Sequence, residues 1–573
     1  MHPVDWIIVA LLNGGIIAYG FYLARGTHSS SEWFLGRRAL PWWAIGMSMF
    51  ATNVDNADIV SVAGKTYATG LHILSVYSLG SILGGILAGF YIVPRMYRAG
   101  LYTNAEYLEA RFGIGARILS ALIQIQYRTT MLGLMLWSVY LLLTGLDVLS
   151  PNQAWILIVV LVICSGIYTA WGGLRSVVWT DALQGLVMMV GVAVIFCAVW
   201  QAAGGWSGAI ENLTAQSQGQ AEPNGNLERL THIGHYDGSD GDYTPFQFSM
   251  GGKRFNPGAY VVVLGWSIIG GGYWVVNHTQ TMRLMGARSI WDMKMAACVG
   301  VGISLPVMIA LACLGVFGRS LSADELVKPD EIYPQLIKEY MGIGLKGLVV
   351  AAVVASAVST VDSMGSALSA IFTRDIYARL FAPNKTDEHY VIVGRWATAG
   401  VLLIGFLYLP FIAMQRNMLD ALTTLIPVFV TPLFAMYVIG AFTSVHRRSG
   451  MIGLLVGSAY GVFALYDRES RHIGWLYELD GVPAWLTDRW AALCWSFLIT
   501  SIAILAASLS WRSQKEDEIQ QVRQTGWLER SRESLPEFRE HPFHNKVPPW
   551  AIPELYAIFI TAISFYVVFV AFW

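Results

Sequence analysis

The chain has 573 residues, of which 55% are hydrophobic and only 13% are charged, and its mean hydropathy is +0.51. This composition excludes a soluble protein with a polar shell around its core, and it favours a membrane protein. The formal net charge of −1 provides no basic surface for nucleic acid, so we expect no nucleic-acid partner.

Segments long enough to cross a lipid bilayer recur along the whole chain. A helix that crosses about 30 Å of hydrocarbon needs about 20 apolar residues. Ten segments contain no Asp, Glu, Lys or Arg: 6–24, 66–94, 148–174, 182–210, 255–282, 295–318, 396–415, 421–446, 490–511 and 555–573. Four further stretches with polar interruptions are 39–69, 118–146, 344–373 and 449–466. The sequence therefore predicts an all-α polytopic membrane protein with about 14 transmembrane helices.

Basic residues in the short connections predict the orientation. Arg37 and Arg38 follow the first span, and Arg95 and Arg98 follow the third, so this side is cytoplasmic by the positive-inside rule. The loop 202–254 then faces outward. An even number of spans places both termini outside, in a multi-pass protein of the plasma membrane, or of the cell inner membrane in a bacterium.

Two predicted spans are interrupted near their middle. Residues 51–58 (ATNVDNAD) divide the second span, and residues 270–274 (GGGYW) divide the seventh, where each glycine weakens a helix by about 1 kcal/mol relative to alanine. Such interruptions persist in a membrane where they line a cavity or a binding site. The alternative for the glycines is that they permit close packing between helices.

The two interruptions open two successive blocks of five spans, which is the pattern of an inverted-repeat transporter. In such folds the unwound backbone holds cations and a polar substrate at the middle of the membrane. The predicted parts are a leading helix and cytoplasmic loop (1–39), a first repeat (40–201), an outer loop (202–254), a second repeat (255–446) and trailing helices (447–573). The trailing part includes a cytoplasmic segment, 512–552.

Four hydroxyl groups follow one face of the predicted helix within 344–373. Ser356, Ser359, Thr360 and Ser363 stand at positions i, i+3, i+4 and i+7. Sodium is a hard cation that prefers oxygen ligands, so this column is a candidate cation site. Hydrogen bonding between neighbouring helices is the alternative for the same residues.

Longer motifs resemble the sodium:solute symporter family over nearly the whole chain. They are Glu32–Gly36 (EWFLG), Leu40–Trp43 (LPWW), Trp171–Asp181 (WGGLRSVVWTD), Met282–Arg283, and Ser359–Thr360 followed by Phe372–Tyr377 (FTRDIY). The resemblance implies a leucine-transporter-type fold with a five-plus-five inverted repeat. One leading helix and three trailing helices would flank this core.

The resemblance also implies where sodium binds. Backbone carbonyls of Ala51, Val54 and Ser356, with the hydroxyls of Ser359 and Thr360, would form the main sodium site. Asp181, Thr360 and Ser363 would form a second cation site, as in some members of the family.

Substrate contacts are assigned in the same way. The expected residues are Asn53, Asp55, Asp58, Tyr77, Arg128, Gly270, Tyr273 and Trp274. Tyr273 matches an aromatic gate on the cytoplasmic side of the substrate. Four positions, Asp58, Tyr77, Gly270 and Gly302, differ from the sugar-binding residues of the sugar transporters, which argues against a neutral hexose.

Arg128 lies about ten residues inside an apolar stretch, where an unpaired charge costs several kcal/mol. A substrate carboxylate is one candidate partner, because a guanidinium binds a carboxylate through two hydrogen bonds. The resemblance supports this, since the sialic acid branch uses an arginine in this helix. A structural ion pair with Asp55 or Asp58 on the first broken helix is the alternative.

Together these observations predict a symporter that uses sodium to import a small polar organic solute, such as a sugar, a sugar acid or another carboxylate. A sensor or scaffold that binds solute without accumulating it is the alternative. No P-loop, HExxH or GxSxG motif occurs, and the five cysteines lack metal-binding spacing. We therefore expect no enzyme, no organic cofactor and no transition metal, while protons remain open as a coupling ion.

Overall fold

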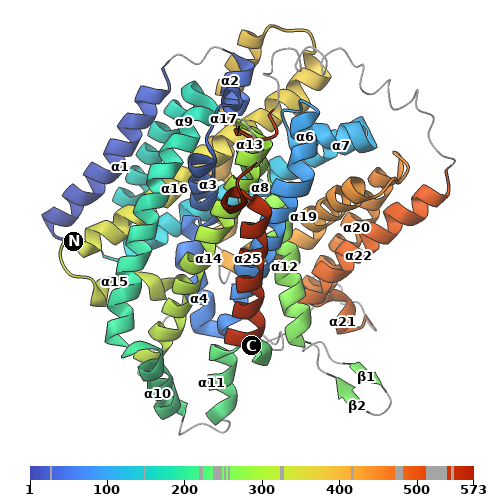
Figure 1. Cartoon of the computed structure of the whole chain (residues 1–573). Helices are drawn as coiled ribbons and strands as arrows, with labels where there is room; N and C mark the ends of the chain where they lie inside the picture. Colours follow the sequence, from blue (N-terminus) through green and yellow to red (C-terminus); the bar gives the residue numbers. More distant parts are fainter. Residues whose placement is uncertain are drawn as a thin grey trace.

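The computed structural model describes the chain except residues 26–28, 148, 218–222, 237–247, 251–252, 256–257, 323–327, 414–417, 471–481, 512–538 and 544–546. Most of the predicted cytoplasmic segment 512–552 and part of the outer loop 202–254 therefore lie outside the described residues. Helices make up nearly all of the described part (Figure 1). A short hairpin of β1 (Phe248–Met250) and β2 (Lys253–Phe255) is the exception there.

The first half of the chain contains α1 (Pro3–Leu23), α2 (Ser30–Leu35), η1 (Gly36–Arg38), α3 (Trp42–Asn53), α4 (Asn56–Thr69), η2 (Leu71–Ile73), η3 (Val76–Ser81), α5 (Ile82–Ile86), η4 (Leu87–Ile92), α6 (Val93–Arg98), α7 (Asn104–Phe112), α8 (Ile114–Gly145), α9 (Pro151–Ala202), α10 (Gly205–Ser217), α11 (Pro223–Thr231) and η5 (Ile233–His235).

The second half contains α12 (Gly258–Val276), α13 (His278–Met285), α14 (Ile290–Leu321), η6 (Pro329–Glu331), α15 (Ile332–Tyr340), α16 (Leu345–Ile371), η7 (Phe372–Phe381), α17 (Asp387–Leu407), α18 (Leu409–Ala413), α19 (Met418–Phe442), α20 (Ser449–Ser470), α21 (Ala484–Thr487), α22 (Arg489–Leu509), η8 (Pro549–Ala551), α25 (Pro553–Tyr566) and η9 (Val567–Ala571).

Eleven helices in the described residues are long and apolar enough to cross a membrane. The expected all-helical membrane bundle is therefore present. The three remaining predicted spans fall on the broken pair α3 and α4, on the long helix α8, and on the second half of α9. The count of about 14 stays a prediction.

The bundle has two distinct ends (Figure 1). The elements α2, α6, α7 and α13 gather at one end, where α6 and α7 carry Arg95, Arg98 and Arg111. The elements α10, α11 and the hairpin lie at the other end, together with the C-terminus. Backbone hydrogen bonds from Ile233 and Gly234 to the carbonyls of Phe572 and Trp573 attach the last helix there.

One of the two predicted helix breaks is present in the structure, and the other is not at its predicted position. As expected, the second span is interrupted: α3 ends at Asn53 and α4 begins at Asn56. The expected break at 270–274 is wrong, because α12 continues through these glycines to Val276. The chain leaves the helix instead at Asn277, whose side chain accepts a hydrogen bond from the backbone N–H of Thr279 and caps α13.

The glycines of α12 serve close packing, which is the alternative that the sequence left open. A Cβ atom on Gly270 would lie 2.5 Å from the carbonyl carbon of Gly80 in η3. A Cβ atom on Gly84 in α5 would lie 2.7 Å from the Cα atom of Gly271. The two backbones therefore cross almost in contact, and backbone cannot move aside as a flexible side chain can.

Helix α9 contains a sharp turn between two helical segments, 151–172 and 174–202. Gly173 at the turn has φ +59°, a conformation that glycine adopts at little cost. A Cβ atom there would also lie 2.4 Å from the carbonyl oxygen of Trp33 in α2. This turn divides the 52-residue helix close to the boundary between the predicted spans 148–174 and 182–210.

A buried ion network joins α7, α8 and η7 at the end that carries α2. Arg117 is fully buried and contacts Glu109 at 2.6 Å, Asp375 at 2.7 Å and Glu106 at 3.3 Å. Burial raises the pKa of Glu109, but hydrogen bonds and charge from Arg379 and Arg117 outweigh it and hold that pKa below its ordinary value. Because these charges are desolvated, removal of any one of them would leave its partners buried without a compensating charge.

Gly84→Ala tests the close crossing of α5 and α12. We expect the variant to unfold at a lower temperature, with a destabilisation of about 1–3 kcal/mol, because the new methyl group meets backbone. Gly400→Ala in α17 is the matched control, since a Cβ atom there meets nothing within 4 Å. Thermal unfolding of the detergent-solubilised protein measures both. Equal melting temperatures for the two variants would contradict the packing.

Candidate functional site

The break between α3 and α4 leaves backbone carbonyls without partners inside the helix. Val54 has φ −103° and ψ 83°, which is outside the helical region, and Asp55 caps α4 by accepting a hydrogen bond from the N–H of Asp58 at 2.9 Å. The last carbonyls of a helix have no intrahelical donor, so they need partners elsewhere. Inside a membrane those partners must come from the protein itself.

Three hydroxyl groups from other helices meet these carbonyls. Ser359 Oγ of α16 lies 3.4 Å from the oxygen of Ala51, and Ser356 Oγ donates to the oxygen of Val54 at 3.2 Å. Tyr273 Oη of α12 donates to the oxygen of Thr52 at 2.6 Å. The broken helix is thus attached to both α16 and α12 at the same point.

The five residues expected to hold sodium lie together in this region. In addition to the contacts above, Thr360 Oγ1 donates to the carbonyl oxygen of Ser356 at 3.0 Å. All five are buried between the end of α3 and the middle of α16. The cluster consists only of carbonyl and hydroxyl oxygens, which are the ligands that a hard monovalent cation requires.

The second expected cation site is occupied by an arginine. Arg283 of α13 contacts Asp181 Oδ2 at 2.7 Å and also donates to Ser363 Oγ. Ser48 and Ser359 donate to the same carboxylate at 2.6 and 2.7 Å. All these side chains are buried, so the guanidinium balances the charge of Asp181 without any bound ion.

The hydroxyls expected at this second site are also engaged elsewhere. Ser363 Oγ donates to the carbonyl of Ser359 at 2.6 Å and lies 3.0 Å from Thr52 Oγ1. Thr360 Oγ1 bonds the carbonyl of Ser356 and so belongs to the first cluster.

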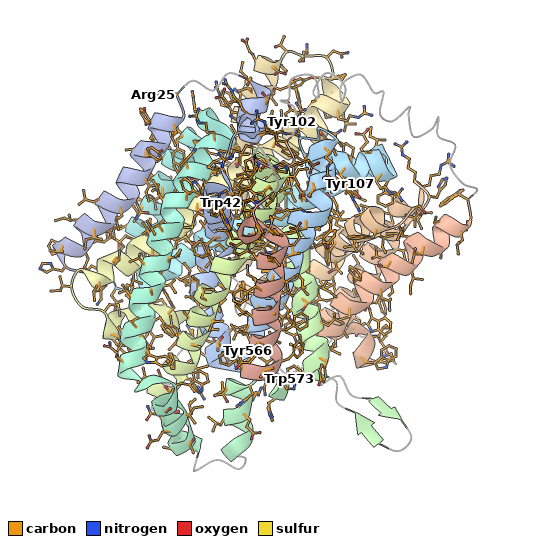
Figure 2. The ribbon with its side chains drawn as sticks, in the orientation of Figure 1. Arg25, Trp42, Tyr102, Tyr107, Tyr566 and Trp573 are labelled. Carbon is orange, nitrogen blue, oxygen red and sulfur yellow. The ribbon has the colours of Figure 1, made fainter. Side chains whose placement is uncertain are left out.

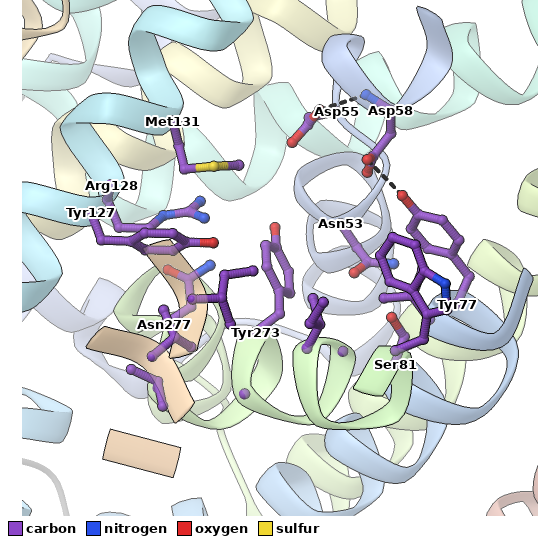
Figure 3. Close-up of a pocket in the computed structure, with 18 of the residues that line it drawn as sticks. Asn53, Asp55, Asp58, Tyr77, Ser81, Tyr127, Arg128, Met131, Tyr273 and Asn277 are labelled. Atoms are coloured by element: carbon purple, nitrogen blue, oxygen red, sulfur yellow. Dashed lines mark hydrogen bonds between the residues drawn. The ribbon is translucent and has the colours of Figure 1, made fainter. Parts of the chain in front are cut away.

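Next to the oxygen cluster, a cavity opens between α3–α4, η3, α8 and α12 (Figure 3). The centre of a water molecule can move through about 70 Å³ of it, which suits a small solute. Seven expected substrate residues line it: Asn53, Asp55, Asp58, Tyr77, Arg128, Gly270 and Tyr273.

Trp274 differs from this expectation, since it is absent from the cavity wall. Its ring is fully buried against the positions of Gly85 and Gly300, between α12, α5 and α14. Consecutive residues of a helix point about 100° apart, so Trp274 faces away when Tyr273 faces the cavity.

Arg128 projects into the cavity from α8 (Figure 3). It is 2% exposed, and its Nε and Nη1 atoms have no hydrogen-bond partner in the part of the chain that the structure describes. The ring of Tyr273 lies 5.4 Å from its guanidinium carbon. Among the described residues no carboxylate lies within 4 Å of it, so the expected ion pair with Asp55 or Asp58 is not formed.

The acidic residues lie on another side of the cavity, on α4 and at its cap. Tyr77 Oη donates to Asp58 Oδ1 at 2.6 Å. Asp55 is 4% exposed and caps α4 through its Oδ1 atom. Figure 3 shows Arg128 on one side of the cavity and this acidic pair on another.

Several functional side chains escaped the sequence analysis. Arg283 was recognised only as part of a motif, because its partner Asp181 is 102 residues away. Further lining residues are Val76, Ser81, Gln124, Tyr127, Met131, Trp266, Ile269, Gly272, Val276, Asn277, Ile426 and Val430. Many of them follow known positions by helical spacing: Gln124 and Met131 flank Arg128 on one face of α8.

Comparison with known proteins identifies the family. The model of the sodium:solute symporter family matches residues 33–457. Sodium/glucose cotransporter 1 of Oryctolagus cuniculus is 26% identical over 511 residues, which cover 84% of this chain and 75% of the relative. The sodium/glucose cotransporter of Vibrio parahaemolyticus is 25% identical over 485 residues, covering 80% and 84%.

Solved structures agree in fold. A Na⁺-coupled sialic acid symporter in a substrate-bound outward-open state has a TM-score of 0.71 and 19% identity, covering 90% of this chain and 99% of that one. Mhp1, a nucleobase-cation-symport-1 family transporter in a closed conformation, has a TM-score of 0.51 and 13% identity, covering 86% and 98%. These relatives are transporters and not enzymes, and the family match spans most of the sequence. The chain belongs to the sodium:solute symporter family.

Proposed function

We propose that this protein couples the inward flow of sodium to the import of a small polar organic solute by alternating access. The observation that carries the proposal is the position of the α3–α4 break. Residues 51–54 contribute carbonyls to the oxygen cluster, while Asn53, Asp55 and Asp58 line the solute cavity. One unwound segment thus contacts both ligands, so each stabilises the segment for the other.

Sodium in this proposal binds the cluster of Ala51, Val54, Ser356, Ser359 and Thr360. Neutral oxygens bind sodium weakly enough to release it on the inner side. Tyr273, which bonds the Thr52 carbonyl and lines the cavity, acts as the gate on the cytoplasmic side of the solute.

The solute in this proposal carries a carboxylate. Arg128 supports this, because its buried guanidinium faces the cavity without a hydrogen-bond partner among the described residues. The sialic acid symporter of similar fold also transports an acid, whereas the curated relatives transport glucose. The wall has Asp58 and Tyr77 hydrogen-bonded to each other, an arrangement that suits a charged solute better than a neutral sugar.

The membrane arrangement is part of the same proposal. Residues 40–201 and 255–446 form two inverted repeats, each beginning with a broken helix, α3–α4 and α12–α13. Residues 447–573 add trailing helices. The end that carries α10 and α11 faces outward, with both termini on that side of the plasma membrane.

One sodium ion accompanies each solute in this proposal, because Arg283 already occupies Asp181 and Ser363. A second sodium there would have to displace a buried guanidinium from its carboxylate. Breaking such a pair costs about 3–5 kcal/mol.

Uptake into proteoliposomes tests the function directly. We expect an inward sodium gradient to drive accumulation of one class among radiolabelled sugars, sugar acids, monocarboxylates and amino acids, whereas equal sodium on both sides gives equilibration only. Binding without accumulation under any ion gradient would indicate a sensor or scaffold. Accumulation driven by a proton gradient without sodium would identify protons as the coupling ion.

Thr360→Ala and the double variant Ser359→Ala/Thr360→Ala test the sodium site. Loss of hydroxyl ligands should raise the sodium concentration for half-maximal uptake by about tenfold or more. Thr360→Ala is the cleaner variant, because Ser359 also bonds Asp181. Ser369→Ala is the control, a buried hydroxyl of α16 that bonds only the Ser366 carbonyl. Unchanged sodium dependence in the double variant would refute the assignment.

Arg283→Gln tests the proposed stoichiometry through the sodium dependence of the melting temperature. For the unmodified protein we expect a Hill coefficient near one. The variant should melt lower in choline chloride, and sodium should then stabilise it with a Hill coefficient approaching two, because Asp181 becomes free to bind an ion. Arg283→Gln/Asp181→Asn should remove that second effect. A coefficient near two in the unmodified protein would disprove the single-sodium proposal.

A further inference from the structure

The solute cavity carries opposite charges on two separate sides. Arg128 enters it from α8, while Asp55 and Asp58 enter it from α4 and its cap (Figure 3). Neither side is neutralised by direct contact with the other, because the described residues show no ion pair within 4 Å between Arg128 and either acid. A ligand that fills the cavity therefore meets both signs of charge.

The basic side can bind an anion directly. Arg128 is only 2% exposed, and its Nε and Nη1 atoms have no hydrogen-bond partner among the described residues. Its guanidinium carbon lies over the ring of Tyr273, 5.4 Å from the ring centroid, and this contact uses none of the N–H groups as hydrogen-bond donors. A carboxylate is the anion that matches a planar pair of N–H donors.

The acidic side can bind a cation with N–H groups. Asp55 accepts a hydrogen bond from the backbone N–H of Asp58 at 2.9 Å, and Asp58 accepts one from the hydroxyl of Tyr77 at 2.6 Å, so both donors are neutral. In the described part of the chain no Lys, Arg or His lies within ion-pair distance of either carboxyl group. Two carboxyl groups and one guanidinium leave an excess of acidic groups around the cavity.

The cavity wall also contains a set of apolar side chains, beside the polar Asn53, Ser81, Gln124, Tyr127 and Asn277. Val76, Met131, Ile269, Val276 and Val430 line it. The part of a solute in contact with these apolar side chains gains from being apolar or short, because hydroxyl groups that face them would lose hydrogen bonds to water.

We propose that the solute is a small zwitterion whose carboxylate binds Arg128 and whose protonated amine binds Asp55 and Asp58 beside Tyr77. This inference rests on the proposed function and specifies its substrate class. It assigns Asp55, Asp58 and Tyr77 as an ammonium subsite.

Other solute classes satisfy only part of this cavity. A neutral sugar leaves the buried guanidinium and the carboxyl groups without charged partners. A simple carboxylate pairs with Arg128 but brings a negative charge towards Asp55 and Asp58, and a simple amine brings a positive charge towards Arg128. Each mismatch lowers affinity by repulsion, which is how a site rejects the wrong solute.

Binding measurements with matched compounds test the proposal. Glycine, β-alanine, 4-aminobutanoate and 5-aminopentanoate place an ammonium and a carboxylate at increasing separation. Each is compared with the carboxylate that lacks its amine and the amine that lacks its carboxylate, with glucose as neutral probe. We expect one zwitterion in sodium chloride to bind at least about tenfold more tightly than both of its truncated analogues, as judged by calorimetry and the shift in melting temperature.

Variants separate the two subsites. Asp58→Asn should lower the affinity for the zwitterion by about tenfold or more. The affinity for the matching carboxylate should fall little or rise. Arg128→Gln should lower the affinity for the zwitterion and leave the affinity for the matching amine unchanged. Asp147→Asn is the control, since this exposed carboxylate pairs with Lys338 outside the cavity. Stabilisation by sodium alone must persist in Asp58→Asn, which shows that the variant is folded.

Three results would overturn the inference. Sodium-driven accumulation of a simple carboxylate, with no zwitterion bound, would leave the proposed function standing and remove the ammonium subsite; accumulation of a sugar would leave only sodium-coupled import and would also remove the carboxylate assignment. Equal weakening of zwitterion and carboxylate by Asp58→Asn would give Asp58 a structural role. Uptake driven by a proton gradient and lost in Asp58→Asn would assign the acids to a proton. Failure of sodium to affect any solute would instead contradict the proposed function itself.

Discussion

The unwound segment at Val54 and Asp55 is the constraint on which the rest of the site depends. A membrane offers no water to the carbonyls that a broken helix releases, so the protein must supply their partners. Here Ser356 and Ser359 of α16 and Tyr273 of α12 do so. The break therefore draws two other helices to one point, and the oxygen cluster and the solute cavity are both formed there. Figure 2 shows the side chains along all the helices of the bundle.

Buried charge follows a related rule, because a desolvated charge needs a partner nearby. Arg117 contacts three carboxylates, and Arg283 contacts Asp181 together with three hydroxyl groups or carbonyls around it. Arg128 is different, since it lies in the cavity without a hydrogen bond among the described residues. A fully satisfied pair holds helices together, whereas an unsatisfied one in a cavity is available to a ligand. This contrast distinguishes Arg117 and Arg283 from Arg128, the arginine proposed to bind the solute.

From the sequence alone, features set by local chemistry could be predicted well. The polar run at 51–58 contains its own helix cap, Asp55, so the break followed from residues within one turn. The glycines at 270–272 were misjudged, because a glycine run is equally suited to a break and to a tight crossing. Only the position of Gly80 and Gly84 on a different helix decides between them. The same limit applies to Arg128, whose partner depended on side-chain positions, and to Trp274, whose direction depended on the rotation of α12.

The network around Asp181 includes both a proposed sodium ligand and a buried ion pair that holds helices together. A substitution there would therefore change the proposed sodium coupling and the stability of the fold at the same time. Ser359 donates a hydrogen bond to Asp181 and lies 3.4 Å from the Ala51 carbonyl oxygen, so it belongs to the proposed sodium ligands and also contacts the charge pair of Asp181 with Arg283. Arg283 in turn lies on α13, beyond the second break, and Ser48 on α3 links the same carboxylate to the first broken helix. A cation that binds the Ser359 hydroxyl would therefore affect both broken helices through the hydrogen bonds of Asp181 to Ser48 and Arg283. In the proposed transport cycle these helices move together, and this buried network is a set of contacts through which one can act on the other.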